Sequence, residues 1–152
     1  MEMISNEEKI TQAVLVSVDT GDYDAEASLA ELKELVKSAG AEPVFTVTQN
    51  LKRPETGTYV GTGKLQEIAD ICKQQEIDLL VFDCELSPTQ IRNIEAETDT
   101  RTIDRTMLIL DIFALRARSK EGKLQVELAQ LKYLMPRLTG KGVAMSRLGG
   151  GI

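Results

Sequence analysis

The side chains that most often carry out catalysis are sparse in this chain, which contains no histidine among its 152 residues. Nucleophilic catalysis by a Ser-His-Asp or Cys-His arrangement is therefore excluded. Cys72 and Cys84 do not form a Cys-x-x-Cys pair, and without histidine a structural zinc site has too few ligands. We expect two reduced, partly buried thiols and no structural metal site. Because histidine is absent, any catalysis would have to use carboxylates, lysine or a catalytic metal ion.

A glycine-rich segment before a predicted helix could bind phosphate. It consists of Gly61, Thr62, Gly63 and Lys64. Backbone N–H groups and the helix dipole would hold the anion, and the lysine would add charge. The segment departs from a Walker A motif at Thr58 and Leu65, and from a dinucleotide fingerprint at Gln66. A nucleotide site is therefore one interpretation, and a tight strand-to-helix turn is the other.

Three acidic residues follow predicted strands, namely Asp19, Asp83 and Glu85. Ligands of open parallel sheets bind at the carboxyl ends of the strands, so a magnesium site or a phospho-acceptor carboxylate is conceivable there. The alternative is that these are ordinary exposed acids in an acidic part of the chain.

Basic residues are concentrated at the other end of the chain. Residues 1–104 hold nine basic and 21 acidic side chains, whereas residues 105–152 hold nine basic and three acidic ones. Such a split indicates an anionic partner for the basic segment. The candidates for contacts with RNA phosphates are Arg116, Arg118, Lys120 and Lys123, followed by Arg137, Lys141 and Arg147. The alternatives are a solvated helix face and a flexible basic loop.

The elements that would position these residues alternate between strands and helices. Apolar and β-branched runs predict strands over 13–18, 43–48 and 78–83, with a short fourth strand over 100–103 and an extended segment over 58–60. Helical spacing predicts helices after Asp22 or Asp24, after Gly61 and after Ser87. The pattern predicts an α/β fold over residues 1–104, with a small, mostly parallel four-stranded sheet and flanking helices.

A long helix is predicted next. Leu110, Ala117, Leu124 and Leu131 are spaced by seven, and this phase continues across Gly122, so we predict one protruding helix over 105–135. Beyond Arg116 it has only an apolar stripe, which requires a partner helix. We expect the basic, glycine-rich loop 136–152 to be truncated and the partner helix to lie downstream, and we expect the unpaired stripe to favour homo-oligomers.

The sequence shows no signal-peptide core and no apolar run long enough to span a bilayer. We therefore expect a cytoplasmic protein without a membrane span. Its size and hydrophobic content suit one ordinary core with an extension.

Four segments in the last two thirds of the chain resemble a known family. They read TYVGTGKLQEI, ELSPTQIRNIE, IDRTMLILDIFALRARSKEGKLQVELAQLKYLMPRL and SRLGGGI. Through them the chain resembles the N-terminal region of the HflX family of translational GTPases, whereas residues 1–58 match only in general pattern. The resemblance implies an α/β subdomain, a long helix paired with a second helix across a glycine-rich loop, and then a GTPase domain.

The same resemblance implies a function. HflX proteins bind the large ribosomal subunit and are linked to splitting or rescuing stalled ribosomes under stress, with the loop directed toward ribosomal RNA. The GTP-binding motifs lie downstream, so this chain is expected to be no enzyme by itself and to hold no cofactor, GTP and Mg²⁺ belonging to the full-length protein. ATP binding has also been proposed for the N-terminal region, and the turn from Gly61 to Lys64 is where it would occur. Ribosome binding is the main hypothesis, with an adenine-nucleotide-binding domain and a self-association module as alternatives.

Overall fold

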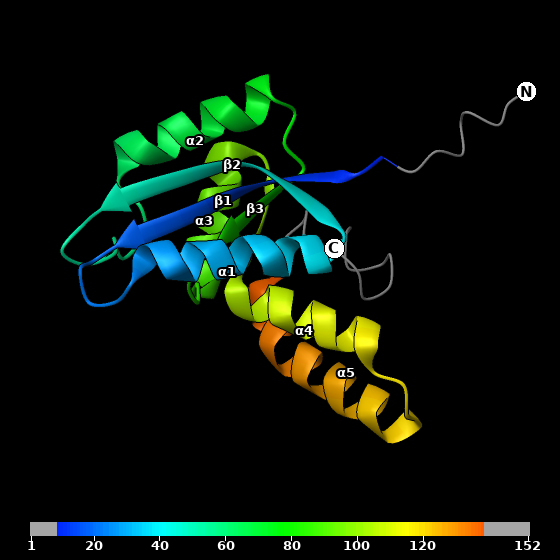
Figure 1. The fold of residues 1–152 in the computed structure, drawn as a ribbon. Helices are drawn as coiled ribbons and strands as arrows, with labels where there is room; N and C mark the ends of the chain where they lie inside the picture. The colour runs from blue at the N-terminus through cyan, green and yellow to red at the C-terminus, as the bar shows by residue number, and fades with distance from the viewer. Residues whose placement is uncertain (1–8, 139–152) are drawn as a thin grey trace, which may run out of the picture.

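The computed structural model describes residues 9–138, which form a parallel sheet with helices on both faces, followed by a helical hairpin (Figure 1). The strands are β1 (Thr11–Asp19), β2 (Ala41–Asn50), β3 (Leu79–Phe82) and β4 (Arg101–Asp104), in the order β2-β1-β3-β4. The helices are α1 (Ala25–Ser38), α2 (Thr62–Gln74), α3 (Pro88–Thr98), α4 (Arg105–Arg116) and α5 (Lys120–Leu134), with a short 3-10 turn, η2 (Met135–Arg137). The predicted α/β class and four-stranded sheet are confirmed.

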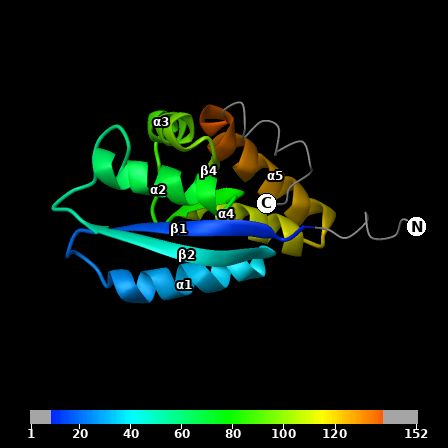
Figure 2. The same ribbon diagram turned by 90° about the horizontal axis from the view of Figure 1, so that it is seen from above.

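The two central strands are buried on both faces. Ala13 to Val16 in β1 and Leu79 to Phe82 in β3 are at most 1% exposed, because α1 covers one face of the sheet and α2 and α3 cover the other (Figure 2). Strands covered on both sides need apolar side chains in both directions, which explains their continuous apolar sequences. In this order β2 lies on one side of β1 and β3 on the other, so the topological switch point of the sheet, here called the crossover, lies between β1 and β3.

Capping side chains fix where the helices begin. Asp24 accepts a hydrogen bond from the N–H of Ala27 and starts α1. Ser87 and Gln90 form a reciprocal capping box at the start of α3, with Pro88 in the first turn. These starts agree with the sequence prediction, because a cap is a local interaction.

The predicted extended segment at residues 58–60 is not a strand of the sheet. Tyr59 has a left-handed backbone with φ of 65° and pairs with Glu55 in an isolated bridge. Its ring packs edge-on against Phe82, with 6.1 Å between the ring centroids. The loop before α2 therefore covers the carboxyl ends of the strands at the crossover, where open sheets often bind ligands.

The prediction of one helix from residue 105 to residue 135 is wrong. The chain leaves the helix at Ala117, whose ψ is 129°, and Ser119 caps a new helix by accepting a hydrogen bond from the N–H of Gly122 at 2.9 Å. A Cβ atom at position 122 would lie 2.9 Å from the Ser119 hydroxyl oxygen, so this cap requires a close approach that glycine permits. α5 folds back along α4, and the two helices form a hairpin (Figure 1).

The apolar stripe of α5 does not face α4. The half-buried face of α5 contains Gly122, Val126, Gln130 and Tyr133. The stripe consists of Leu124, Leu128, Leu131 and Met135, which are 53–63% exposed. The stripe is thus open in the described residues even though α5 has a helical neighbour, and homo-oligomers through it stay a prediction.

One carboxylate joins the sheet to the hairpin. Asp104, at the end of β4, is fully buried and accepts three hydrogen bonds. Its donors are the N–H of Leu86 at 2.9 Å, the N–H of Met107 at 2.9 Å and the hydroxyl of Tyr133 at 2.5 Å. The same side chain therefore fixes the loop before α3, caps α4 and holds the end of α5.

We predict that Asp104→Ala lowers the free energy of unfolding by about 3–4 kcal/mol, because it leaves several buried donors without an acceptor. Tyr133→Phe removes one of these bonds and should cost about 1–2 kcal/mol. Urea unfolding monitored by circular dichroism measures both changes. The exposed Glu127→Gln serves as the control, and equal stability of Asp104→Ala and this control would contradict the role of Asp104.

Candidate nucleic-acid interface

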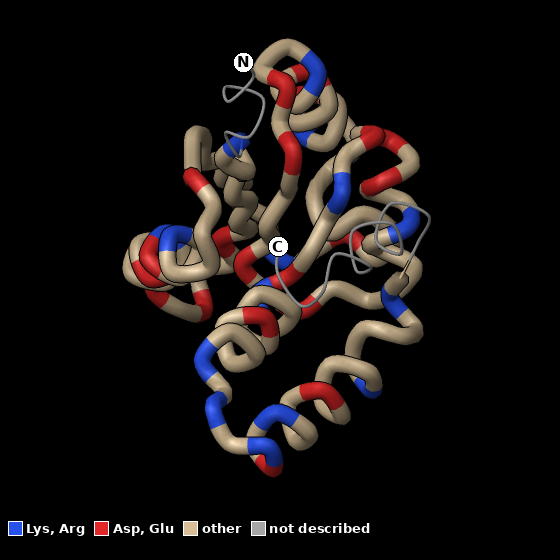
Figure 3. Tube along the Cα trace, turned by 90° about the vertical axis from the view of Figure 1, so that its right-hand side faces the viewer, with Lys and Arg blue, Asp and Glu red and all other residues tan. Residues whose placement is uncertain are grey.

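Four predicted RNA-binding cations lie together at the turn of the hairpin. Arg116 ends α4, Arg118 lies in the turn, and Lys120 and Lys123 occupy the first turn of α5. All four are exposed, and none forms a salt bridge with another residue in the described range 9–138. We call these four residues the basic turn. Figure 3 shows Lys and Arg gathered at this end of the hairpin, while acidic residues are distributed over the sheet domain.

The fold brings the basic turn together in a way that the sequence did not suggest. In a single helix these residues would lie at successive positions along a rod. The break at Ala117 instead places them around the connection between two helices, at the end of the hairpin away from the sheet (Figure 1). Arginine and lysine presented at a protruding end suit contacts with phosphates, because their charges meet a surface before the rest of the domain does.

A buried polar group holds the two helices of the hairpin. The Gln130 side chain of α5 donates to the Asp111 carboxylate of α4 at 3.3 Å. Burial raises the pKa of Asp111 to about 6, against the opposing effects of the nearby Arg101 charge and the Gln130 hydrogen bond. Arg101 is 8% exposed, and burial lowers its pKa while Asp111 and Glu95 oppose the change. This set could not be predicted from the sequence, because Asp111 stands in an apolar run and its neighbours come from β4 and α5.

Arg137 is engaged by the protein itself. Its guanidinium lies over the ring of Tyr133, 3.8 Å from the centroid, and its Nε donates to the carbonyl oxygen of Leu86 at 3.0 Å. A further nitrogen, Nη1, donates to the carbonyl oxygen of Tyr133 at 3.0 Å. These contacts fasten the end of α5 beside the start of α3. The other two candidates of the loop, Lys141 and Arg147, lie outside the described residues.

The phosphate-turn candidate lies at the start of α2. Gly61 precedes the helix with φ of −64° and ψ of 157°, so the turn needs no left-handed glycine. Its N–H donates to the Gln49 side chain at 2.9 Å, and a Cβ there would come within 3.2 Å of the same amide. Lys64 forms an ion pair with Glu67 at 3.4 Å. Thr62 and Gly63 open the helix, whose start has no side-chain cap and no acidic residue in its first turn.

The acids at the strand ends are not arranged as a metal site. Asp83 forms an ion pair with Arg105 at 2.6 Å, and Arg105 also bonds Glu31 of α1. In the described part of the chain no three acidic or cysteine side chains are grouped as metal ligands. Cys84 lies beside Tyr59, and burial raises its pKa to about 12, so its thiol is protonated and unreactive at neutral pH.

Two family models cover most of the chain. The model described as GTP-binding GTPase N-terminal matches residues 26–114, and the one described as GTP-binding GTPase Middle Region matches residues 116–152. The boundary between the two matches therefore coincides with the end of α4.

Curated relatives carry the name GTPase HflX. One from Alkalihalophilus pseudofirmus is 53% identical over 145 residues and 94% of this chain, and one from Escherichia coli (strain K12) is 49% identical over 142 residues and 93% of it. The chain belongs to the HflX GTPase family. It spans about a third of the length of these HflX relatives, namely 34% and 33%.

Solved structures extend this similarity to the fold. A GTP-binding protein from Sulfolobus solfataricus in complex with GDP is 31% identical, with a TM-score of 0.62 over 91% of this chain and 41% of its own. The SsGBP and GDP complex is 30% identical, with a TM-score of 0.65 over 93% of this chain and 41% of its own. Residues 1–104 alone would give a smaller coverage, so the similarity of this HflX chain reaches into the hairpin.

No helix in residues 9–138 is both long enough and apolar enough to cross a bilayer.

The raised pKa of Asp111 predicts a pH dependence of stability. The folded state binds this proton more tightly than the unfolded state, whose pKa is near 3.8. The stabilisation of the folded state by protonated Asp111 is therefore fully present below about pH 4. It is lost as the pH rises through about 6, which lowers the free energy of unfolding by at most about 2–3 kcal/mol.

We expect Asp111→Asn to lose less stability than the unmodified chain between pH 4 and pH 7. Urea unfolding at each pH measures this difference, which isolates Asp111 from the other acids. An NMR titration of the Asp111 carboxyl carbon with a midpoint near 4 would contradict the assignment.

Proposed function

We propose that this chain is the part of an HflX GTPase that binds the large ribosomal subunit, in the splitting or rescue of stalled ribosomes under stress. The observation that carries the proposal is the basic turn, Arg116, Arg118, Lys120 and Lys123, at the protruding end of the hairpin. Membership in the HflX family supports it. The residues of the basic turn would contact phosphates of ribosomal RNA.

The charge of the sheet domain supports an approach through the basic turn. Residues 1–104 carry 21 acidic and nine basic side chains, so RNA phosphates repel this part of the molecule. The hairpin separates the four cations from the acidic domain, and the attraction is largest at its end. Electrostatic attraction and repulsion together would orient the protein on the subunit.

In this proposal Arg137 positions the hairpin, and the loop residues Lys141 and Arg147 add RNA contacts beyond the described residues. The guanidinium of Arg137 has three nitrogen atoms, which carry five N–H donors. Two of these nitrogens already donate to backbone carbonyl oxygens. The remaining Nη2 group is the part of this side chain that could reach RNA.

We also propose that the chain itself does not hydrolyse GTP. It corresponds to about a third of its HflX relatives, and its glycine-rich turn lacks the residues of a Walker A motif at Thr58 and Leu65. GTP and Mg²⁺ would bind the remainder of the full-length protein, in the cytoplasm.

An adenine-nucleotide site at the start of α2 is the second candidate. The uncapped first turn of α2, with no acidic residue, favours an anion there. The hydrogen bond from Gly61 to Gln49 and the ion pair between Lys64 and Glu67 compete with it. The basic turn, whose cations form no such contact with residues 9–138, is therefore the stronger candidate.

The first test neutralises the basic turn in the full-length protein. Changing Arg116, Arg118, Lys120 and Lys123 to Gln should weaken binding to purified large subunits and flatten the dependence of log K on log salt by about 3. This value follows from a slope of about 0.7–0.9 for each phosphate that a cation neutralises. Co-sedimentation across a salt series measures both quantities.

The matched control changes four exposed lysines of the sheet domain to Gln, namely Lys33, Lys37, Lys52 and Lys73. It alters the net charge equally and should leave the salt slope unchanged. Equal effects of the two quadruple variants would show that net charge, and not the basic turn, governs binding. A separate Lys141→Ala, Arg147→Ala variant tests the loop without disturbing Arg137, and unchanged affinity would remove the loop from the proposal.

The second candidate is tested by calorimetry of the chain with ATP. A saturable heat that Lys64→Ala abolishes would support nucleotide binding at α2. The expected result is no heat at millimolar ATP, since the competing contacts of Gly61 and Lys64 are already made. Retention of binding in Lys64→Ala would place the nucleotide elsewhere.

A further inference from the structure

A small cavity lies between the sheet and the N-terminal half of α1, separate from the basic turn. It has a volume of about 260 Å³ and is lined by β1, β2 and the segment that begins α1. Its polar lining residues are Ser17, Asp19, Tyr23, Asp24, Glu26 and Thr48. Ser17 and Thr48 are direct neighbours in the register of β1 and β2, so their side chains lie on the same face of the sheet.

Ser17 is the innermost polar group of this cavity. It is 1% exposed, and its hydroxyl has no hydrogen-bond partner in the described part of the chain. A buried hydroxyl without a partner is costly, commonly by about 1–3 kcal/mol. Ala13 and Leu15, which lie on the same face of β1 as Ser17, are apolar and fully buried, so a serine at position 17 has no packing advantage. A ligand in the cavity would satisfy the hydroxyl.

The backbone holds two carboxylates at the cavity. The N–H of Gly21 donates to Asp19 Oδ1 at 2.9 Å, and the N–H of Ala27 donates to Asp24 Oδ1 at 3.0 Å. The second oxygen, Oδ2, of each carboxylate makes no hydrogen bond within residues 9–138. Tyr23 is fixed as well, because its hydroxyl donates to the carbonyl oxygen of Val18 at 3.0 Å. These acceptors are therefore oriented before any ligand arrives.

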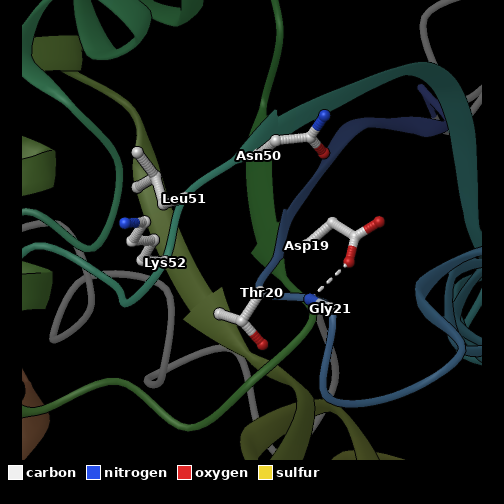
Figure 4. A pocket seen from close by; sticks show the side chains of 6 residues that line it. All are labelled: Asp19, Thr20, Gly21, Asn50, Leu51 and Lys52. Atoms are coloured by element: carbon white, nitrogen blue, oxygen red, sulfur yellow. Dashed lines mark hydrogen bonds between the residues drawn. The ribbon is translucent and has the colours of Figure 1, made fainter.

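The charge of the lining selects a cation. Asp19, Asp24 and Glu26 are acidic, and no Lys or Arg lines the cavity. The start of α1 contributes about half a positive charge, which the three carboxylates outweigh. Lys52 lines the adjoining open groove together with Asp19 and Asn50, but it extends away from both of them (Figure 4).

The remaining features favour an organic cation over a metal ion. The described residues contain no group of three acidic or cysteine side chains placed as metal ligands. Ala25 and Leu29 of α1 give the cavity an apolar wall, and the ring of Tyr23 can face a cation. An alkyl chain with an ammonium end matches this combination. The volume lies below the range of about 300–1,000 Å³ that is typical of drug-sized ligands, so the occupant is small.

We propose that this cavity binds an aliphatic ammonium group. The ammonium donates to the Ser17 hydroxyl oxygen and to the free Oδ2 atoms of Asp19 and Asp24, while its alkyl chain lies along Leu29. A free diamine and a lysine side chain of a protein partner share this chemistry. The inference does not depend on ribosome binding, because it involves the acidic domain and none of the residues of the basic turn.

The test is a titration of the ¹⁵N-labelled 152-residue chain, followed by the amide shifts of Ser17, Thr48 and Leu29. The probes are 1,4-diaminobutane, the N-methylamide of Nα-acetyl-lysine, and 1-butanol as the neutral control. We expect saturable shifts at these amides with the two ammonium probes and none with butanol. Tighter binding of the diamine would indicate a free polyamine, and tighter binding of the lysine derivative would indicate a protein partner.

Two variants and one control decide the site. Asp19→Asn should weaken the ammonium probe at least about tenfold, and Ser17→Ala about threefold or more, because each removes an acceptor. Asp22→Asn removes the same charge from an exposed residue that does not line the cavity, and it should change the affinity less than about twofold. Circular dichroism checks that each variant is folded. No saturable shift, or equal weakening by Asp19→Asn and Asp22→Asn, would overturn the proposal.

Discussion

The arrangement of this molecule depends on the hydrogen bonds of one buried carboxylate, Asp104. It ends the last strand, caps α4 and binds the Tyr133 hydroxyl, so one charged group fixes three segments that are far apart in the sequence. A fully buried carboxylate is stable only if donors surround it. This requirement couples the folding of the sheet to the docking of the hairpin, because the donors come from both.

The neighbouring residue extends the same junction to the other face of the sheet. Arg105 forms ion pairs with Asp83 at the end of β3 and with Glu31 on α1. At the end of α5, the Arg137 guanidinium lies over the ring of Tyr133. Charged groups that would otherwise be available at the ends of the strands are thereby used to hold the structure. The acidic residues left open around the start of α1 and the cations left open at the basic turn lie in different parts of the molecule. The acidic surface at the start of α1 can therefore bind a cation while the basic turn binds an anion.

The sequence was informative where the interactions are local. The capping box at Ser87, the cap at Asp24 and the apolar runs of β1 and β3 follow from neighbours a few residues apart, and they were located correctly. The hairpin was missed because the spacing of seven from Leu110 through Ala117 to Leu124 continues across the break, although Leu110 and Leu124 lie in different helices. The choice depended on the Ser119 cap and on the contact between Gln130 and Asp111, and the second of these exists only after the chain has folded back.

The sequence by itself determined the fold class, the family and the separation of acidic and basic residues, because composition, periodicity and long motifs do not depend on contacts. Only the tertiary structure decided how the candidate residues are used. It gathered Arg116 to Lys123 around a turn, engaged Arg137 and Asp83 in the junction, and left the Ser17 hydroxyl without a partner among the described residues. Each of these outcomes depends on distances between segments that are remote in sequence, and hydrogen bonds and ion pairs act only within a few ångströms.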